Sequence, residues 1–573
     1  MVDVYGLAGI IIFYTLVLAI GVWAGTKQKN HGEEEVMLAG RNVGLFVGVL
    51  TLTATWVGGG YINATAEALF TTGLVWCQVP LGYSLALVVG ALLFVKPMRE
   101  ASYVTMLDPF QQAYGNRIGG LLFLPALCGD VFWIASVLSS LGASLMVILD
   151  ISNTWSVTIS TIFAAAYTVS GGLYSVTYTD VLQLICIVIG LCLSFPFAIS
   201  NAQPYLKEPN MTIFSKVDWL GTVETKDYGL WIEGMLLLAF GGIPWQSYFQ
   251  RVLSLRSTKA AYHLSTLSAL LCFSMAIPAG AFGIIARMVD WSAIPTYGKN
   301  FTAAESNSVL PLVLKELTPN WVAFFGLGAV TAAVMSSADA GILSSSSMFT
   351  RNIYKLSFRP KASERELIWV LRISIAVIAT LACIIALSSV SIYYLSVLCS
   401  DIVYVILFPQ LVLVIYWAKH VNNYGCLSSY LIGLLLRISG GEIGIGIPAF
   451  IKYPGYDYVA EQQKFPFKTF AMLMSALSHM LISALAAYVF QNNILSPDKW
   501  DVLNAFPDLH INGIEKEHNG KELRSKEGII KSRSNKAVTD AVKGTRYSDV
   551  TIVSNLDQSP PDGSVVAHEF SKF

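Results

Sequence analysis

Runs of glycine interrupt two apolar segments of this chain, and these interruptions limit its fold more than any other feature. The first lies in TATWVGGGY at residues 53–61, and the second in FGGIPWQ at residues 240–246. Inside a bilayer, a backbone group that leaves a helix without a new partner costs several kcal/mol. Interrupted helices in corresponding halves of a chain therefore indicate the binding site of a secondary transporter. Each break also carries a tryptophan, which favours a small cation as the solute.

The composition is that of a membrane protein rather than a soluble one. The 573 residues are 54% hydrophobic and 13% charged, whereas soluble domains are roughly 25% charged. The formal net charge is zero, so no basic surface suggests nucleic acid. Apolar runs of about 20 residues, each able to cross a bilayer core, recur along the chain. We expect an all-α polytopic membrane protein with thirteen transmembrane helices, near residues 5–24, 43–66, 74–95, 119–149, 155–175, 180–200, 229–249, 263–288, 319–349, 366–388, 393–416, 425–443 and 469–491.

Basic residues predict the orientation of these spans. Lys and Arg gather in the short loops at 25–42, 96–117, 250–262, 350–366 and 417–424. Short cytoplasmic loops carry an excess of Lys and Arg. Because the number of spans is odd, we expect the N-terminus outside the cell and the C-terminal end in the cytoplasm.

Two glycosylation sequons agree with this orientation. Asn210 and Asn300 each begin an Asn-x-Thr sequence, and both lie in loops that are predicted to be outside. Glycans are attached to such sequons in exoplasmic loops. We therefore expect both asparagines to be glycosylated.

The chain changes character after the last predicted span. Residues 1–491 are expected to form the transmembrane domain, whereas residues 492–573 mix charged residues with Ser, Pro and Gly. Such a composition cannot bury enough apolar surface to fold, so we expect a disordered cytoplasmic tail. This tail is either a solvated extension or a segment that trafficking adaptors or kinases recognise.

The first glycine break can supply ligands for a cation. Where the backbone leaves the helix at residues 58–60, it exposes carbonyl groups of the preceding turn, including those of Ala54 and Val57. Sodium is a hard cation that binds several oxygen atoms, and unwound carbonyls provide them without a net charge. We expect a hydroxyl-rich helix to face this break and to complete the site.

Residues 332–347 are the best candidate for that helix, with six serines and Asp339. An ionisable residue within the membrane indicates a functional site. We expect Ser336, Ser337 and Asp339 to couple an ion. The alternative is that the serines only let helices approach closely or bond back to their own backbone, which is our interpretation of 344–347.

Aromatic residues within the spans predict a second kind of site. Trp56, Tyr83, Trp133 and Trp245 lie inside spans rather than at their ends, where interfacial aromatics are usually found. The face of a tryptophan ring attracts a cation, and several rings together form the known cage for quaternary ammonium groups. The alternative for any single tryptophan is packing, but two tryptophans at two helix breaks favour the cage.

Other charged residues within the predicted spans have structural explanations. Asp108 and Asp180 resemble loop or capping residues. Arg437 and Glu442 lie near a Gly-Gly pair and could form an ion pair with a structural or gating role. The common motifs of hydrolases, nucleotide-binding enzymes and metalloenzymes are missing, so we expect no enzymatic activity.

Several motifs together resemble the sodium/solute symporter family, and within it the choline-transporting branch. The likeness covers residues 5 to 491 and fades in the tail. The first glycine break and the Ser-Ser helix are shared with sugar and other symporters, whereas the tryptophans are specific to the choline branch. The motifs are TATWVGGGYIN (53–63), YVTMLDPF (103–110), GGLYS (171–175), GIPWQ (242–246), VMSSAD (334–339) and KFPFK (464–468).

The resemblance implies a fold of the leucine-transporter type, with two inverted repeats of five helices. Spans two to six and seven to eleven would form the repeats, and the first span and the last two would be peripheral. It also implies sodium-coupled, chloride-dependent choline uptake that supplies acetylcholine synthesis at presynaptic terminals and in synaptic vesicles. Chloride cannot be placed on residues. The chain departs from the family at Asp130, where relatives carry Glu, and its tail lacks their sorting motif.

The same resemblance implies two sets of site residues. The sodium ligands would be the carbonyls of Ala54, Val57 and Ala333 and the hydroxyls of Ser336 and Ser337. The choline cage would be Trp56, Tyr83, Trp133 and Trp245. Two alternatives stay open: a sodium symporter for betaine or an amino acid, and a sensor or channel that does not transport. A homo-oligomer also stays open.

Overall fold

The computed structural model describes residues 4–25, 37–170, 173–207, 219–389 and 391–507. These residues form helices and four isolated β-bridges, and no β-strand occurs among them. The chain divides into two compact units, one made of Met1–Ser496 with Asp501–Ala505 and the other of Pro497–Trp500 with Phe506–Phe573. The second unit contributes the short helix α21 (Pro497–Trp500) and residues 506–507 to the described residues. Most of the predicted tail therefore lies outside them.

Helices of the first predicted repeat follow a peripheral helix, α1 (Val4–Gly25). They are the broken pair α3 (Leu45–Trp56) and α4 (Gly59–Thr71), then α5 (Val79–Gly90), continued by η3 (Ala91–Val95) and α6 (Lys96–Glu100), then α8 (Phe123–Leu149), α9 (Asn153–Ser170) and α10 (Leu173–Ala202). An additional helix, α7 (Asp108–Leu121), precedes α8.

The second predicted repeat has the same order of a broken pair followed by long helices. Its members are α11 (Tyr228–Gly241) with α12 (Gln246–Ser254), α13 (Thr258–Met288), α15 (Asn320–Met348) with its π-helical extension η9 (Phe349–Phe358), α16 (Glu364–Ser388), and α17 (Ile392–Leu398) joined to α18 (Phe408–Tyr416) by the π-helix η10 (Val403–Leu407). The helices α14 (Val309–Glu316), α19 (Asn423–Ser439) and α20 (Phe467–Gln491) complete the bundle.

Each of the thirteen predicted ranges coincides with a helix or a broken helix. By length and composition, eight helices among the described residues are able to cross a membrane, or nine if the bent pair α3–α4 counts as one span. The all-α membrane fold is therefore confirmed, whereas the count of thirteen stays a prediction.

Both predicted helix breaks are present. Helices α3 and α4 meet at 49°, and Val57 and Gly58 between them leave the helical conformation. Glycine is required at position 58 because a Cβ atom there would lie 1.6 Å from Oγ of Ser337. At the second break, the helix ends at Gly241, and Trp245 has an extended backbone just before α12.

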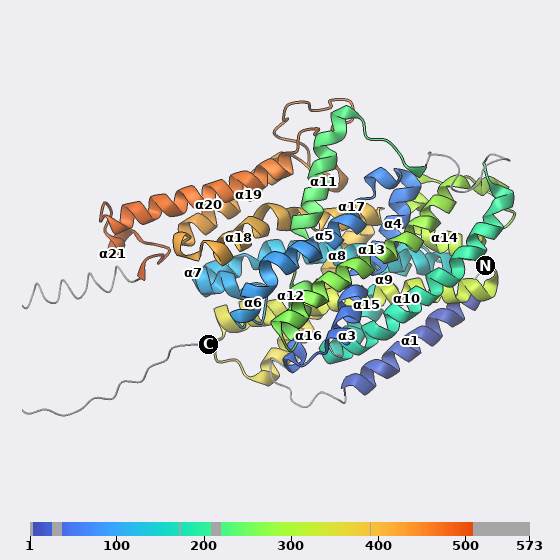
Figure 1. Ribbon diagram of the computed structural model, residues 1–573, viewed down its shortest axis with the longest axis horizontal. Helices are drawn as coiled ribbons and strands as arrows, with labels where there is room; N and C mark the ends of the chain where they lie inside the picture. Colours follow the sequence, from blue (N-terminus) through green and yellow to red (C-terminus); the bar gives the residue numbers. More distant parts are fainter. Residues whose placement is uncertain (1–3, 26–36, 171–172, 208–218, 390, 508–573) are drawn as a thin grey trace, which may run out of the picture. The chain divides into compact units, whose positions relative to one another are not determined.

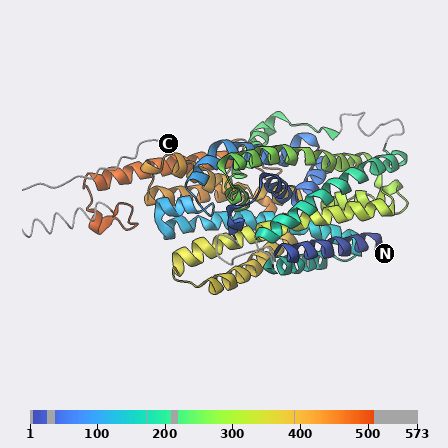
Figure 2. The same ribbon diagram turned by 60° about the horizontal axis from the view of Figure 1, so that its bottom comes forward.

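Helix α15 forms the centre of the first unit, and every residue from Gly326 to Met348 is buried. Helices α1 and α10 run beside it, and α19 and α20 form a pair of their own (Figures 1 and 2). A helix that is buried on all sides belongs to the core of a bundle. Its polar residues therefore face other helices rather than lipid.

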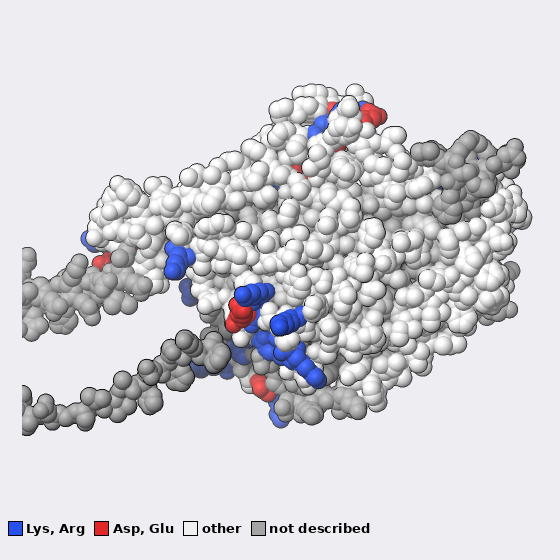
Figure 3. Space-filling view, in the orientation of Figure 1, with Lys and Arg blue, Asp and Glu red and all other residues white. Residues whose placement is uncertain are grey.

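The outer surface has the character of a lipid contact. Large apolar side chains point outward, among them Leu270 and Ile277 of α13 and Ile373 of α16, which are 64%, 67% and 60% exposed. Figure 3 shows one face, where Lys, Arg, Asp and Glu gather in a few small areas and leave most of the described surface uncharged. In water such a surface would aggregate, whereas lipid tails accept it.

The loop positions of the sequons lead to a test of orientation. Asn300 is exposed in the loop between α13 and α14, and Asn210 lies outside the described residues. We expect Asn210→Gln and Asn300→Gln each to remove one glycan-sized shift on an electrophoresis gel. An epitope at the C-terminus should stay inaccessible to antibody in intact cells. Labelling without permeabilisation would show that the predicted orientation is inverted.

Candidate functional site

Four buried aromatic rings form a closed ring in the first unit, three of them from α3, α5 and α8 and one from the residue before α12. The centroid of Trp56 lies 5.9 Å from that of Tyr83 and 6.0 Å from that of Trp245. The centroid of Trp133 lies 5.9 Å from Tyr83 and 6.1 Å from Trp245, which closes the circle. All four side chains are buried. The structure therefore brings together all four predicted cage residues.

The two helix breaks position half of this cage. Trp56 is the last residue of α3, and Trp245 is the last residue before α12. The indole N–H of Trp245 donates to the carbonyl of Gly241 at 2.8 Å, which fixes the ring across the second break. A continuous helix would carry these two rings away on its regular spiral, so the breaks are needed to bring them beside the other two. Trp56 stacks on Tyr83, whereas Trp245 lies edge-on to Trp56 and Trp133.

The cage contains no charged group of its own. The Tyr83 hydroxyl donates to the carbonyl of Ser396 at 2.7 Å, which directs its polar atom toward α17. The indole nitrogen of Trp56 is buried and has no hydrogen-bond partner. What the four residues offer to a ligand is therefore a set of π faces, which attract a cation without a carboxylate.

The first break and the serine helix also lie against each other. Oγ of Ser337 donates to the carbonyl of Thr55 at 2.8 Å, across the interface between α3 and α15. Around Gly58 the helix break and α15 are close enough that an added Cβ would contact both Ser337 and the carbonyl of Ala333. The carbonyls of Ala54 and Val57 belong to the same turn, and both residues are fully buried.

Asp339 lies three residues beyond Ser336 in the same helix. Its carboxylate is buried, and neither oxygen has a hydrogen-bond partner. A buried carboxylate without partners is costly unless a cation or a proton neutralises it. The geometry is therefore that of an incomplete polar site.

Asp180 was expected to be a loop or capping residue, and this prediction was wrong. Helix α10 begins at Leu173, two turns before the predicted start of the span, so Asp180 lies inside the membrane helix and is fully buried. It accepts hydrogen bonds from Ser336 at 2.6 Å and from Thr51, and Arg251 approaches to 3.4 Å. In the sequence, the segment that continues without interruption from residue 173 was the signal that could have placed Asp180 inside the helix.

The second serine run is only in part a packing feature. Ser344 donates to the carbonyl of Gly341 at 2.9 Å, as expected for a serine that bonds back to its own helix. Ser345, in contrast, donates to the carboxylate of Asp130, and the hydroxyls of Ser346 and Ser347 have no partner. The packing interpretation therefore holds for Ser344 and fails for Ser345.

The expected pairing of Arg437 and Glu442 is present but belongs to a larger cluster. Arg437 contacts Glu442 and also Asp401, the latter at 2.5 Å. Lys468 adds a second cation, 2.7 Å from Asp401 and 3.4 Å from Glu442. The sequence indicated neither Asp401 nor Lys468 as partners, because they come from distant helices. The four groups join the segment between α17 and η10, the C-terminal end of α19 with the residues after it, and the start of α20.

Comparisons with known proteins agree with this geometry. Residues 36–433 match the family model described as "Sodium:solute symporter family". "High-affinity choline transporter 1" of Drosophila melanogaster is 50% identical over 98% of this chain and 91% of its own length. "High affinity choline transporter 1" of Homo sapiens is 50% identical over 88% of this chain and 89% of its own length. A solved Na⁺-coupled sialic acid symporter shares the fold, with a TM-score of 0.68 at 17% identity, over 84% of this chain and 98% of that one.

The ion-pair cluster gives a prediction about stability. Arg437→Gln should lower the free energy of unfolding by about 3 kcal/mol, because the buried Asp401 and the partly buried Glu442 then share one cation. Adding Asp401→Asn to this variant should restore part of the loss. Thermal unfolding in detergent measures both, with Arg372→Gln, an exposed arginine of α16, as the control. Equal melting temperatures for Arg437→Gln and Arg372→Gln would mean that the cluster contributes nothing to stability.

Proposed function

Because this chain belongs to the sodium:solute symporter family, we propose that it carries choline into cells together with sodium. The family consists of transporters, and the curated relatives named above are choline transporters that match most of the chain. The observation that carries the choice of substrate is the buried ring of four aromatic side chains. We propose that these rings hold the trimethylammonium group.

The chemistry of the cage favours choline over the alternative solutes. A trimethylammonium group has no hydrogen-bond donors, so π faces suit it better than a carboxylate does. Betaine and amino acids carry a carboxylate as well, which would need donors or a cation beside the rings. The four rings contain no charged group, and the buried indole nitrogen of Trp56 has no hydrogen-bond partner. Choline has only a neutral hydroxyl to place there.

We propose that sodium binds between α3 and α15. Its ligands would be the carbonyls of Ala54, Val57 and Ala333 and the hydroxyls of Ser336 and Ser337. Both hydroxyls already donate their protons, Ser336 to Asp180 and Ser337 to the carbonyl of Thr55. A hydroxyl that donates in this way keeps its lone pairs for a cation. Asp339, one turn away, would add a favourable field.

Coupling follows from the position of these ligands. Helix α3 belongs to the first predicted repeat and α15 to the second, so an ion between them would link the two halves. In such folds, access alternates as one repeat rocks against the other around a fixed site. We assign the Arg437 and Glu442 cluster a structural or gating role, because it ties α19 and α20 to Asp401, between α17 and η10, and includes none of the cage residues.

Further features of the proposal rest on the family resemblance alone. They are dependence on chloride, supply of choline for acetylcholine synthesis at presynaptic terminals, and recycling through synaptic vesicles. Glycosylation at Asn210 and Asn300 is proposed from their sequons and predicted loop positions. Assembly into homo-oligomers stays open. The tail would bind trafficking adaptors from the cytoplasm, although the family's sorting motif is missing from it.

Uptake of radiolabelled choline into cells, with and without sodium, tests the proposal. Symport requires uptake that depends on sodium and is competed by choline more strongly than by betaine or proline. Stronger competition by betaine or proline would indicate another substrate. Binding of choline without uptake would indicate a sensor, and sodium-independent uptake would contradict coupling.

Loss of a ring should weaken choline binding in proportion to the π face removed. Trp245→Ala is expected to raise the half-saturation concentration of choline about 30-fold, since a desolvated cation–π contact contributes about 2 kcal/mol. Trp245→Phe keeps a smaller ring and should cost about fivefold or less. Trp369→Ala, which removes an exposed tryptophan of α16, is the control. Unchanged half-saturation in Trp245→Ala would refute the cage.

The sodium ligands can be tested separately from the cage. Ser337→Ala and Ser336→Ala should raise the sodium concentration for half-maximal uptake, and Asp339→Asn should shift it in the same direction. Choline affinity at saturating sodium should change less. Ser344→Ala removes a hydroxyl that is bonded to its own helix and should have no effect. Sodium titrations are normalised to surface-biotinylated protein. If all three variants titrate like Ser344→Ala, sodium does not bind at this interface.

A further inference from the structure

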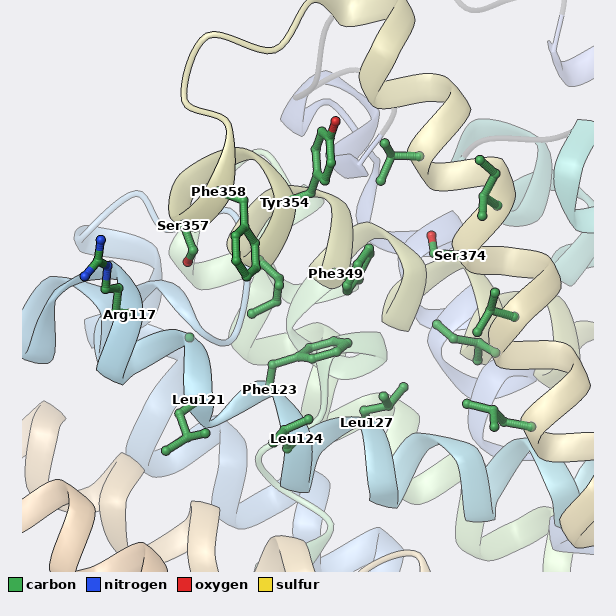
Figure 4. A pocket seen from close by; sticks show the side chains of 17 residues that line it. Arg117, Leu121, Phe123, Leu124, Leu127, Phe349, Tyr354, Ser357, Phe358 and Ser374 are labelled. Carbon is green, nitrogen blue, oxygen red and sulfur yellow. The ribbon is translucent and has the colours of Figure 1, made fainter.

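A large apolar groove that none of the four cage residues lines lies between α7 and α8 on one side and η9 and α16 on the other. Its volume is about 920 Å³. Figure 4 shows Phe123, Leu124 and Leu127 of α8 along one wall, with α16 opposite and Arg117 and Ser357 at one end. Nothing in the proposed transport mechanism uses this groove.

The groove continues into a second one of about 300 Å³, which also lies between α8 and α16. Leu124, Leu127 and Leu381 line both. On α16 the lining runs from Val370 to Ile385, which corresponds to about 22 Å at 1.5 Å per residue. One leaflet of a bilayer core is about 15 Å thick. The combined groove can therefore hold an acyl chain over its whole length.

The groove opens toward lipid rather than into the protein. Its edge residues Ile373, Val377 and Leu381 of α16 are 60%, 52% and 42% exposed, and Leu124 of α8 is 52% exposed. Polar atoms contribute little to its lining. An occupant can therefore enter sideways from the membrane, without passing through water.

The polar end of the groove carries positive charge. Arg117 is exposed there, and no described carboxylate pairs with it. Glu366 of α16 is already held by Arg359 at 3.0 Å and by the hydroxyl of Tyr354, which lines the groove, at 2.5 Å. A negatively charged headgroup would therefore find an available partner in Arg117.

This end faces the cytoplasm in the orientation predicted from the basic loops. Acidic phospholipids are concentrated in the cytoplasmic leaflet, where basic residues near the membrane attract them. Charge, length and apolar lining therefore agree on one occupant. We propose that the groove is a binding site for an acidic glycerophospholipid, with an acyl chain between α8 and α16 and its phosphate at Arg117.

Two substitutions test the acyl-chain contact and the headgroup contact separately. Ile373→Trp places a large ring in the groove from its exposed edge, and Ile277→Trp, on the exposed face of α13, is the matched control. Arg117→Gln removes the headgroup partner, and Lys259→Gln removes an exposed charge from the first turn of α13, on the same predicted side. None of these positions belongs to the cage or to the proposed sodium site.

Full-length protein is reconstituted in nanodiscs with equal amounts of phosphatidylserine and phosphatidylcholine, then transferred to mild detergent. Native mass spectrometry counts the retained phospholipids and identifies their class. We expect the unchanged chain to retain phosphatidylserine preferentially. Arg117→Gln should lower the ratio of phosphatidylserine to phosphatidylcholine about fivefold, the effect of one basic residue. Ile373→Trp should lose the bound lipid of both classes.

Three outcomes would overturn the proposal. Equal lipid counts in Ile373→Trp and Ile277→Trp would show that the groove holds no lipid. Equal class ratios in Arg117→Gln and Lys259→Gln would show that Arg117 does not select an acidic headgroup. A change in the dimer fraction of Ile373→Trp, without a change in retained lipid, would identify the groove as a contact between copies of this chain. Gel filtration of each variant confirms that it is folded.

Discussion

The rest of this structure depends on one constraint, which is that backbone polar groups in a membrane must find partners inside the protein. Long helices satisfy this constraint along most of the chain. At two places the helix is interrupted, and other contacts must stabilise the backbone there. At the first, Gly58 lets α3 and α15 approach until Ser337 can donate to the Thr55 carbonyl. At the second, Trp245 bonds back to Gly241 across the gap. Each interruption is stabilised locally, and each leaves oxygen atoms or an aromatic ring facing the centre.

How much of the structure could be predicted from the sequence depends on whether each interaction is local or joins distant segments of the chain. The helix breaks and the buried position of Trp56 and Trp245 are local features, which glycine runs and hydropathy reveal. The environment of Asp180 is not local, because Ser336 and Arg251 reach it from α15 and α12. Asp401 and Lys468 were missed for the same reason. In a helical bundle, such partners are set by which helices touch, and no spacing in the sequence encodes that.

Several buried polar groups near the centre have no partner within the protein. Both carboxylate oxygens of Asp339 and the indole nitrogen of Trp56 are among them. Groups of this kind destabilise the empty protein. A ligand that satisfied them would therefore stabilise the fold in proportion to its own binding. Unlike the ion-pair cluster at Arg437, which is satisfied internally, this region gains its stability from what it binds.

The closed arrangement of the four rings also affects how fast a bound molecule is released. Trp56, Tyr83, Trp133 and Trp245 are each at most 3% exposed, so a molecule enclosed by them has no direct exit. Its residence time is then set by how often the helices separate the rings, and such helix motions occur in microseconds to milliseconds or more slowly. Each additional aromatic contact that strengthens binding also slows dissociation. A transporter built in this way has a lower turnover rate but can work at low concentrations of its substrate.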